Sequence, residues 1–255
     1  MGEGVLSYFD ELYMEYQMKK HSEESSRKEA EFIVRALDLE PGARVLDIGC
    51  GYGRHAIILS EMGYKVVGLD LSTSYIEVAR EKARKAGVEA EFIPGDMRHM
   101  PWRSEFDGAY MFYTSFGFYD DEDNARVLNE AAAVLKPGGR LLIDARNREY
   151  LVARAAAEGS DRWRWWEGWD DLLVLGEEVL DLRSGRVTDR RMFFKSMQFK
   201  GERSISLRVY SLKELADMME ASGLEVVAVY GDYEMGPYTL LSPRMIIVGR
   251  KVKKS

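Results

Sequence analysis

The sequence predicts an α/β protein built on a doubly wound, mostly parallel sheet. Between Ser25 and Ala145, segments with helical periodicity alternate with short apolar segments that have the composition of strands. These strand segments are apolar along most of their length rather than at every second residue, which is typical of strands covered by helices on both faces. Glycines and Pro-Gly pairs separate several of the segments, as expected for short connections.

Five strands and four helices make up this alternation. The strands are predicted at 44–48, 65–69, 89–93, 106–113 and 140–145. The helices are predicted at about 25–40, 54–62, 72–86 and 121–135. Ser25 is a suitable N-cap for the first helix and Ser72 or Ser74 for the third, whereas Gly87 is a suitable C-cap. Pro137, followed by two glycines, is expected to end the fourth helix.

The segment from about 163 to 210 departs from this alternation. Its strand-like stretches, with a turn at Ser184-Gly185, predict two or three antiparallel strands inserted into the α/β core. After it, a helix at 211–222 and two strands at 225–230 and 245–252 are predicted. We expect those two strands to form an antiparallel pair at the edge of the main sheet, which would then have seven strands.

Three parts of the chain follow from these patterns. Residues 1–150 are predicted to form the α/β core with an N-terminal helical cover. Residues 151–210 are predicted to form the antiparallel insertion, which we expect to act as a lid over a substrate. Residues 211–255 are predicted to return to the core with the final helix and the edge pair of strands.

Composition and charge exclude several classes of protein. Of the 255 residues, 46% are hydrophobic, so the chain can bury a core without disulfides, and its one cysteine cannot form one internally. No apolar run approaches the roughly 18 residues of a membrane helix, and the first residues lack a secretory pattern, so we expect a cytoplasmic protein. The net charge of −7, without a long basic block, disfavours nucleic acid and anionic membranes as partners.

The turn after the first strand, within VLDIGCGYGRHA, is the predicted ligand site. In open parallel sheets, ligands bind beyond the carboxyl ends of the strands, where the next helix offers free N–H groups. Glycines 49, 51 and 53 would let a ligand approach the backbone. Their spacing is G-x-G-x-G, because Arg54 stands where a dinucleotide site has its third glycine. Asp47, two residues before Gly49, would also repel a diphosphate.

Two further acids follow neighbouring predicted strands. Asp70, after the second strand, can accept hydrogen bonds from both hydroxyls of a ribose. Asp96, after the third, could accept from the exocyclic amine of adenine, and Asp47 could bind an ammonium group. An amine, a ribose diol and an aminopurine without phosphate are the groups of S-adenosylmethionine, which we therefore predict as the cofactor.

The motifs VLDIGCGYG, VVGLDLS, GDM and LKPGGRLLID resemble, in order and separation, those of the class I S-adenosylmethionine-dependent methyltransferases. The resemblance covers about 32–145 well and 210–250 more loosely, and implies a Rossmann-like methyltransferase fold. It implies contacts of Asp47, Asp70 and Asp96 with the cofactor's methionine end, ribose and adenine, respectively. The other residues expected at the cofactor are Arg27, Gly49, Cys50, Gly51, Leu71, Met97 and Phe112.

The segments FDGAYMFYTSFGF and LLIDARNREYL are similar to parts of glycine N-methyltransferase and its small-molecule relatives. In those relatives, the loop after the fourth strand and an arginine after the fifth hold a substrate carboxylate. The resemblance therefore implies that Ser115 and Arg146 bind the acceptor, and we expect Tyr113, in a segment that borders the cofactor's methyl group, to be catalytic with them. Thr114 replaces the substrate-binding asparagine, which argues against glycine itself as the acceptor.

Methyl transfer to a small molecule, by displacement in line with the carbon–sulfur bond, is the predicted reaction. Such an enzyme mainly aligns its reactants and excludes water. Tyr113, His21 and Tyr233 lie in segments where a base could stand. The three histidines have no cysteine or acidic companion at ligand spacing, so we predict no metal site.

Two alternatives remain at this point. A non-catalytic module that binds S-adenosylmethionine would keep the three acids but have a blocked acceptor pocket. An NAD(P)-dependent oxidoreductase would share the fold class, although Asp47 and the glycine spacing disfavour it.

Overall fold

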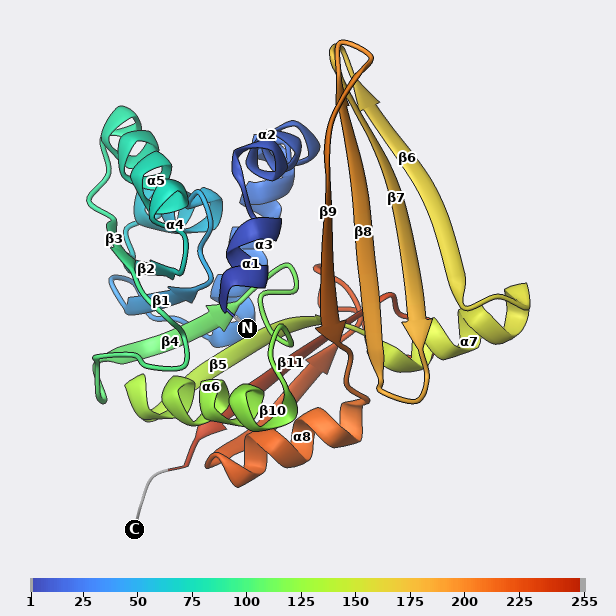
Figure 1. Cartoon of the computed structure of the whole chain (residues 1–255). Helices are drawn as coiled ribbons and strands as arrows, with labels where there is room; N and C mark the ends of the chain where they lie inside the picture. The colour runs from blue at the N-terminus through green and yellow to red at the C-terminus, as the bar shows by residue number, and fades with distance from the viewer. Residues whose placement is uncertain (1, 253–255) are drawn as a thin grey trace.

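The computed structural model describes residues 2–252, with side chains from Val5 onward, and contains two separate sheets (Figure 1). The order of the seven-stranded sheet is β10-β11-β5-β4-β1-β2-β3. Its strands are β1 (Arg44–Ile48), β2 (Lys65–Asp70), β3 (Glu91–Pro94), β4 (Phe106–Met111), β5 (Leu135–Arg146), β10 (Leu224–Tyr230) and β11 (Arg244–Lys251). β1 to β5 are parallel, whereas β11 lies antiparallel between β5 and β10. The predicted Rossmann-like, mostly parallel seven-stranded sheet is confirmed.

Helices cover both faces of this sheet, as the apolar strands predicted. The helices are α1 (Gly2–Tyr8), α2 (Glu11–Lys20), α3 (Glu23–Leu37), α4 (Arg54–Glu61), α5 (Thr73–Ala86), α6 (Asp121–Val134), α7 (Arg148–Glu158) and α8 (Leu212–Ala221). One apolar core lies between the sheet and the buried sides of α6 and α8, and a second between the sheet and α3, α4 and α5. These helices cover the faces of the sheet and not the edge formed by the carboxyl ends of its parallel strands, where a ligand can bind.

Several boundaries differ from the predicted ones for local reasons. The helix expected to start at Ser25 begins earlier, because the Ser22 hydroxyl caps it by accepting from the Ser25 amide. β5 starts at Leu135 instead of 140, and its pairing with β4 shifts between Phe106 and Gly108, so Pro137 and its two glycines lie within an irregular strand. α7 follows directly, because the Asn147 side chain caps its first turn.

The insertion forms a four-stranded antiparallel sheet, which we call the insertion sheet: β6 (Arg162–Trp169), β7 (Leu172–Asp181), β8 (Arg186–Lys195) and β9 (Gln198–Arg208). The sequence predicted two or three strands, and the structure has four. The strand that was not predicted is β6, whose mixed tryptophans and arginines do not give a clear alternation of apolar and polar residues. Tyr8, Tyr13 and Tyr16 of the N-terminal helices pack on the buried face of this sheet, against residues that include Val174 and Phe193.

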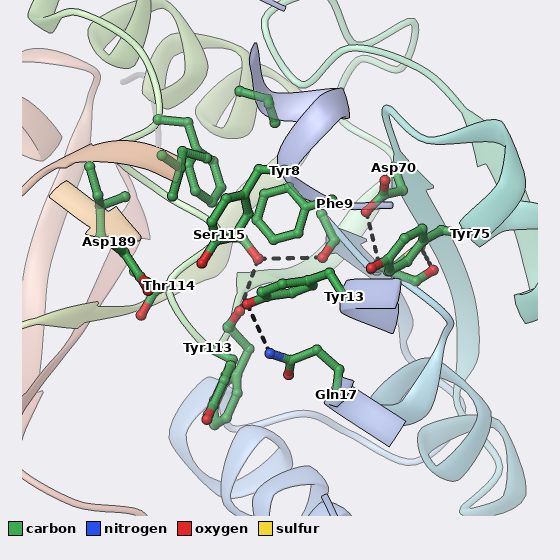
Figure 2. A pocket seen from close by; sticks show the side chains of 18 of the residues that line it. Tyr8, Phe9, Tyr13, Gln17, Asp70, Tyr75, Tyr113, Thr114, Ser115 and Asp189 are labelled. Carbon is green, nitrogen blue, oxygen red and sulfur yellow. Dashed lines mark hydrogen bonds between the residues drawn. The ribbon is translucent and has the colours of Figure 1, made fainter. Parts of the chain in front are cut away.

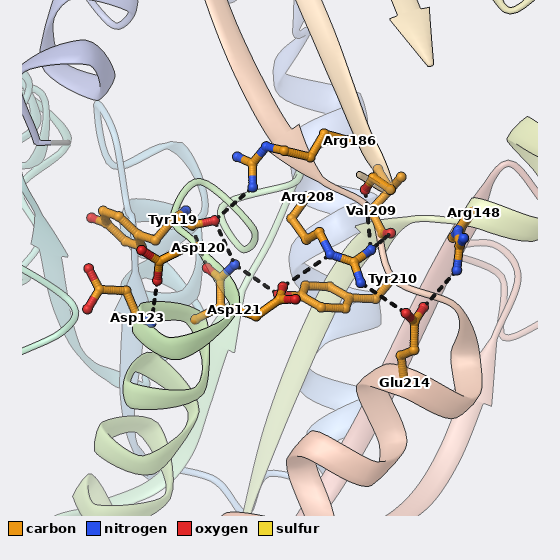
Figure 3. A network of polar contacts seen from close by, with 12 residues as sticks. Tyr119, Asp120, Asp121, Asp123, Arg148, Arg186, Arg208, Val209, Tyr210 and Glu214 are labelled. Carbon is orange, nitrogen blue, oxygen red and sulfur yellow. Dashed lines mark hydrogen bonds and ion pairs between the residues drawn. The ribbon is translucent and has the colours of Figure 1, made fainter. Parts of the chain in front are cut away.

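A polar network fixes the base of the insertion sheet to the core (Figure 3). Arg208 in β9 donates to Asp121 of α6 at 3.1 Å and to Glu214 of α8 at 2.9 Å. The Tyr210 hydroxyl also donates to Asp121, at 2.8 Å. Two core helices thereby hold the end of the inserted segment, which sets where its buried face stands relative to the strand ends.

Candidate functional site

A cavity of about 490 Å³ lies at the carboxyl ends of the parallel strands. Its lining comes from the strand ends and their loops, from α1 and α2, and from the inner face of the insertion sheet. Figure 2 shows Asp70 and Tyr75 on one side, Thr114 and Asp189 on the other, and the ring of Tyr13 between them. A concave site of this size, with both aromatic and polar walls, is typical of small-molecule binding.

The glycine turn between β1 and α4 forms one wall of the cavity. The amides of Gly49 and Cys50 donate to the Leu69 carbonyl at 2.7 and 3.1 Å, which ties the turn to the end of β2. Gly49 has a φ of 78°, and a Cβ there would lie 2.9 Å from the Ser115 Cβ. Glycine is therefore required at this position both by conformation and by the close approach of the loop after β4.

Gly53 is the position in this turn where alanine is expected to be most harmful. Its φ is 77°, and an added Cβ would lie 2.8 Å from the Phe92 ring. Left-handed strain and overpacking together predict that Gly53→Ala lowers the free energy of unfolding by about 2–4 kcal/mol. Thermal unfolding should show a fall in Tm of roughly 4–8 °C for a chain of this length.

Gly87 provides the matched control for that substitution. Its φ of 70° is similar, but no atom lies within 4 Å of an added Cβ. Gly87→Ala is expected to cost only the conformational strain, about 1 kcal/mol. Equal losses of Tm in the two variants would show that the contact with Phe92 does not matter.

Asp70 is the last residue of β2, and each oxygen of its carboxylate accepts a hydrogen bond from a backbone amide. It accepts from the Gly51 amide at 2.8 Å and from the Ser72 amide at 2.9 Å. Burial raises the pKa of Asp70, and these two hydrogen bonds oppose that rise. The carboxylate is thus oriented by the glycine turn on one side and by the start of α5 on the other, and it lines the cavity.

Asp47 is the more deeply buried acid, with 3% of its surface exposed. Burial raises its pKa to about 7, and the nearby Asp70 charge adds to this effect, whereas the Tyr110 hydroxyl and Arg54 oppose it. A carboxylate that is costly to ionise alone becomes stable beside a cation. Asp47 is therefore suited to bind an ammonium group, as the sequence predicted.

The sequence prediction missed Arg54, at the first turn of α4. Its side chain lines the cavity, is 12% exposed, and forms an ion pair with Glu29 of α3. His55 Nε2 lies 2.8 Å from the same Glu29 carboxylate. Although burial acts to raise the pKa of Glu29, the hydrogen bond to His55 and the Arg54 charge hold it at about 2. This cluster fixes a positive charge beside the glycine turn.

Two residues expected at the cofactor do not line the cavity. Arg27 has a side chain 42% exposed and pairs with Glu61 at 2.8 Å on the outer side of α3. Asp96 is held by Arg98, whose Nη2 lies 2.6 Å from its carboxylate, and accepts from the Arg98 amide at 2.9 Å. In the structure, both side chains are engaged by neighbouring charges instead. The other expected cofactor residues do line it: Asp47, Gly49, Cys50, Gly51, Asp70, Leu71, Met97 and Phe112.

The three residues expected to be catalytic lie together in the wall of the cavity. Arg146, the last residue of β5, forms two hydrogen bonds with Glu178 of β7, at 2.7 and 2.8 Å, so the insertion sheet holds its side chain. The Ser115 hydroxyl donates to the carbonyls of Phe112, at 2.9 Å, and Gly49, at 3.3 Å. Tyr113, with a φ of 55°, completes this group.

Of the three predicted positions for a base, Tyr113 lines the cavity and the other two do not. The His21 ring packs edge-on against Tyr113, with 4.5 Å between ring centres. Burial, with the nearby Arg54 charge, lowers the pKa of His21 to about 3, so this imidazole is a weak base. Tyr233 instead donates its hydroxyl proton to the buried carboxylate of Asp144, at 3.0 Å.

The insertion sheet contributes charged residues that the sequence prediction did not single out. Asp189 and Arg191 form an ion pair at 2.6 Å and line the cavity. The Arg191 guanidinium lies 5.1 and 5.0 Å from the ring centres of Tyr13 and Tyr16. Val187, Asp189, Arg191 and Phe193 are every second residue of β8 and so share one face, which Val187 and Phe193 mark as buried. This period of two was the available signal that the two charges face inward.

Among residues 2–252, no group of three or more His, Cys, Asp or Glu side chains is arranged to hold a metal ion. No helix in the same range is long and apolar enough to cross a membrane.

Comparison with known proteins places this site in a family. The profile described as "Methyltransferase domain" matches residues 45–139. The chain is 36% identical over 142 residues to methyltransferase GfsG of Streptomyces halstedii, which covers 53% of this chain and 50% of that protein. It is 29% identical over 208 residues to the cypemycin N-terminal methyltransferase of a Streptomyces species, covering 81% and 82%.

A glycine/sarcosine N-methyltransferase from Aphanothece halophytica is 31% identical over 153 residues, which covers 59% of this chain and 55% of that protein. The chain thus spans about half the length of GfsG and of this enzyme. The predicted distant relationship to glycine N-methyltransferases is confirmed.

Solved structures share the fold over nearly the whole chain. The methyltransferase CcbJ from Streptomyces caelestis has a TM-score of 0.76 at 22% identity, covering 89% of this chain and 90% of its own. CalS10, an amino pentose methyltransferase from Micromonospora echinaspora, has a TM-score of 0.68 at 19% identity, covering 96% and 98%.

Proposed function

This chain belongs to the class I S-adenosylmethionine-dependent methyltransferases, and on that premise we propose that it methylates a small-molecule acceptor in the cavity beneath the insertion sheet. The observation that carries the proposal is a pair of acids, buried Asp47 and half-buried Asp70, that line one cavity beside a glycine turn.

The residues present fit the family's cofactor. The Asp47 carboxylate would hold the ammonium group, and Asp70 would accept from the ribose hydroxyls while its amide partners keep it in place. Arg54, rather than Arg27, is the cation that lines the cavity, and we assign it to the cofactor's carboxylate. When bound, S-adenosylmethionine supplies a methyl group activated by a sulfonium, which an acceptor can displace in line with the carbon–sulfur bond.

The protein's part in the reaction is to enclose and orient the acceptor. Tyr8 of α1, Phe9 of the following turn and Tyr13 of α2 line the cavity, where their rings would keep water away from the reactants. Tyr113 and Ser115, in the loop after β4, and Arg146, at the end of β5, line the same cavity. Alignment of this kind can supply about 7–11 kcal/mol in model reactions, which suits a cofactor that already carries its leaving group.

We propose an amine as the acceptor class. The cavity contains the carboxylates of Glu178 and Asp189 among aromatic rings, and each carboxylate is already paired with an arginine. Because each arginine charge is neutralised by a carboxylate, the cavity, as lined by the described residues, has no excess positive charge to bind a multiply charged anion. Aromatic rings and carboxylates attract an amine. Three of the relatives also have names that refer to amine methylation or an amino sugar: the cypemycin, glycine/sarcosine and amino pentose enzymes.

A screen for product tests this proposal against the non-catalytic alternative. The purified protein is incubated with S-adenosylmethionine and one candidate acceptor at a time. The candidates are sarcosine, glucosamine, a tripeptide with a free N-terminus, benzoate and a phenol. We expect S-adenosylhomocysteine to form above the acceptor-free rate with at least one amine. Intact cofactor binding without product from any compound would instead support a binding module, and product from the phenol or benzoate alone would overturn the amine assignment.

A further inference from the structure

The loop after β4 contains two successive residues with a left-handed backbone conformation, which is unfavourable for any residue other than glycine. Tyr113 has a φ of 55° and Thr114 a φ of 71°, and both line the cavity. Left-handed backbone is costly for residues with a Cβ, most of all for a β-branched residue such as threonine. It persists only where surrounding contacts hold it, and such places are concentrated at functional sites.

Asp144, near the end of β5, makes the contacts that hold this loop. The Tyr113 amide donates to the Asp144 carboxylate at 2.8 Å. The Thr114 amide donates to the backbone carbonyl of Asp144 at 3.0 Å. One fully buried residue thus binds both left-handed amides.

The Asp144 carboxylate is itself fixed from the other side of β5. Arg244 of β11 donates through Nε to the Oδ1 atom at 2.7 Å and through Nη2 to the backbone carbonyl at 3.1 Å. The Tyr233 hydroxyl donates to Oδ2 at 3.0 Å, beside the Tyr113 amide. Because every oxygen of Asp144 has a donor, the carboxylate serves as an anchor and is not free to act as a base.

We propose that Asp144 is a positioning residue for the acceptor site, acting through the backbone of Tyr113 and Thr114. The loop that it holds also carries Ser115, whose hydroxyl donates to the Gly49 carbonyl of the glycine turn. Asp144 therefore links Arg244 of β11 and Tyr233 to the loop after β4, which forms part of the cavity wall. That this wall faces an acceptor rests on the proposed function, but its dependence on Asp144 does not.

Asp144→Asn tests the proposal with little change of volume. An asparagine has one oxygen where the carboxylate has two, so its NH₂ group must face either Arg244 or the Tyr113 amide, both of which are donors. We expect the Tyr113 and Thr114 amides to exchange with solvent at least ten times faster in this variant than in the wild type. NMR measures these exchange rates in the absence of any ligand. The Leu142 amide, in the same strand, should change much less, which separates local release of the loop from general destabilisation.

Asp107→Asn is the matched control. Asp107 also accepts from a backbone amide, that of Arg44 at 2.9 Å, and from the Lys136 ammonium, but it lies at the start of β4 outside the cavity lining. This variant should leave exchange at Tyr113 and Thr114 unchanged. Exchange in Asp144→Asn that equals the wild type, or that rises equally at Leu142, would overturn the proposal.

Affinity for S-adenosylhomocysteine provides the second measurement. Asp47, Asp70 and Arg54 do not contact Asp144 by any hydrogen bond or ion pair that the structure shows among residues 2–252, so we expect the dissociation constant to change less than threefold in Asp144→Asn. A larger loss would place the role of Asp144 at the cofactor and contradict the assignment to the acceptor wall. If no affinity is found even for the wild type, the proposed function fails while the exchange result still stands.

Discussion

Asp70→Ala is expected to weaken binding of S-adenosylhomocysteine about a hundredfold, as measured by titration calorimetry at neutral pH. The Asp70 carboxylate is half-buried, lines the cavity and is oriented by hydrogen bonds from the Gly51 and Ser72 amides. Hydrogen bonds to a charged group contribute about 1.5–3 kcal/mol each, and two ribose hydroxyls can donate to it. Loss of roughly 3 kcal/mol corresponds to about two orders of magnitude in affinity.

Asp96→Ala provides the contrast for this prediction. Asp96 also follows a strand of the sheet, but its carboxylate is held by Arg98 and does not line the cavity. Its removal should change affinity less than threefold. An equal loss in both variants, or none in Asp70→Ala, would mean that the cofactor is not held at the end of β2.

Affinity for the same ligand should rise with pH between about 5.5 and 7.5. Asp47 has a pKa raised to about 7, chiefly by burial, so below pH 7 the free protein carries it mostly protonated. An ammonium group binds the ionised form, and the proton must leave first. The dissociation constant is therefore expected to increase toward tenfold for each unit below pH 7.

Stability of the unliganded protein should depend on pH in the opposite direction. An aspartate in the unfolded chain has a pKa of about 3.9, so between that value and about 7 the folded state binds more protons at Asp47 than the unfolded state. This residue therefore contributes stability at low pH that is lost as the pH rises to about 7. Asp47→Asn should remove that contribution and flatten the pH dependence of affinity; pH profiles identical to wild type would assign both effects elsewhere.

The strand pattern was sufficient to predict the order of the core and the position of its main acids. Asp47 is the last residue but one of β1 and Asp70 is the last residue of β2, and parallel strands bring their carboxyl ends to one edge of the sheet. Gly49 and Gly51 follow from the same rule, because the turn must let a ligand approach the backbone. These residues needed only local periodicity and topology to be placed.

Residues whose role depends on a tertiary partner were harder to predict. Arg27 and Arg54 both pair with acids of the α3–α4 layer, but Arg54, paired with Glu29, lines the cavity, whereas Arg27, paired with Glu61, does not. Asp96 has the expected place in the chain, yet Arg98, two residues later, binds its carboxylate. The sequence alone does not indicate which ion pair forms.

The insertion sheet shows the same difficulty at larger scale. Its inner face meets the N-terminal helices, and contacts such as Lys195 with Glu15, at 2.8 Å, join residues 180 positions apart. Alternation along β8 could have indicated that Asp189 and Arg191 share a face with buried residues. Their meeting with Tyr13 and Tyr16 in one cavity wall depends on how the whole chain folds.

The most direct test of the account is a pair of calorimetric titrations of the wild-type protein at pH 7.5, one with S-adenosylmethionine and one with NADH. We predict saturable binding of one molecule of S-adenosylmethionine per chain and no measurable heat from NADH, because Asp47 attracts an ammonium and repels a diphosphate. Saturation by NADH with no response to S-adenosylmethionine would contradict the assignment of this cavity.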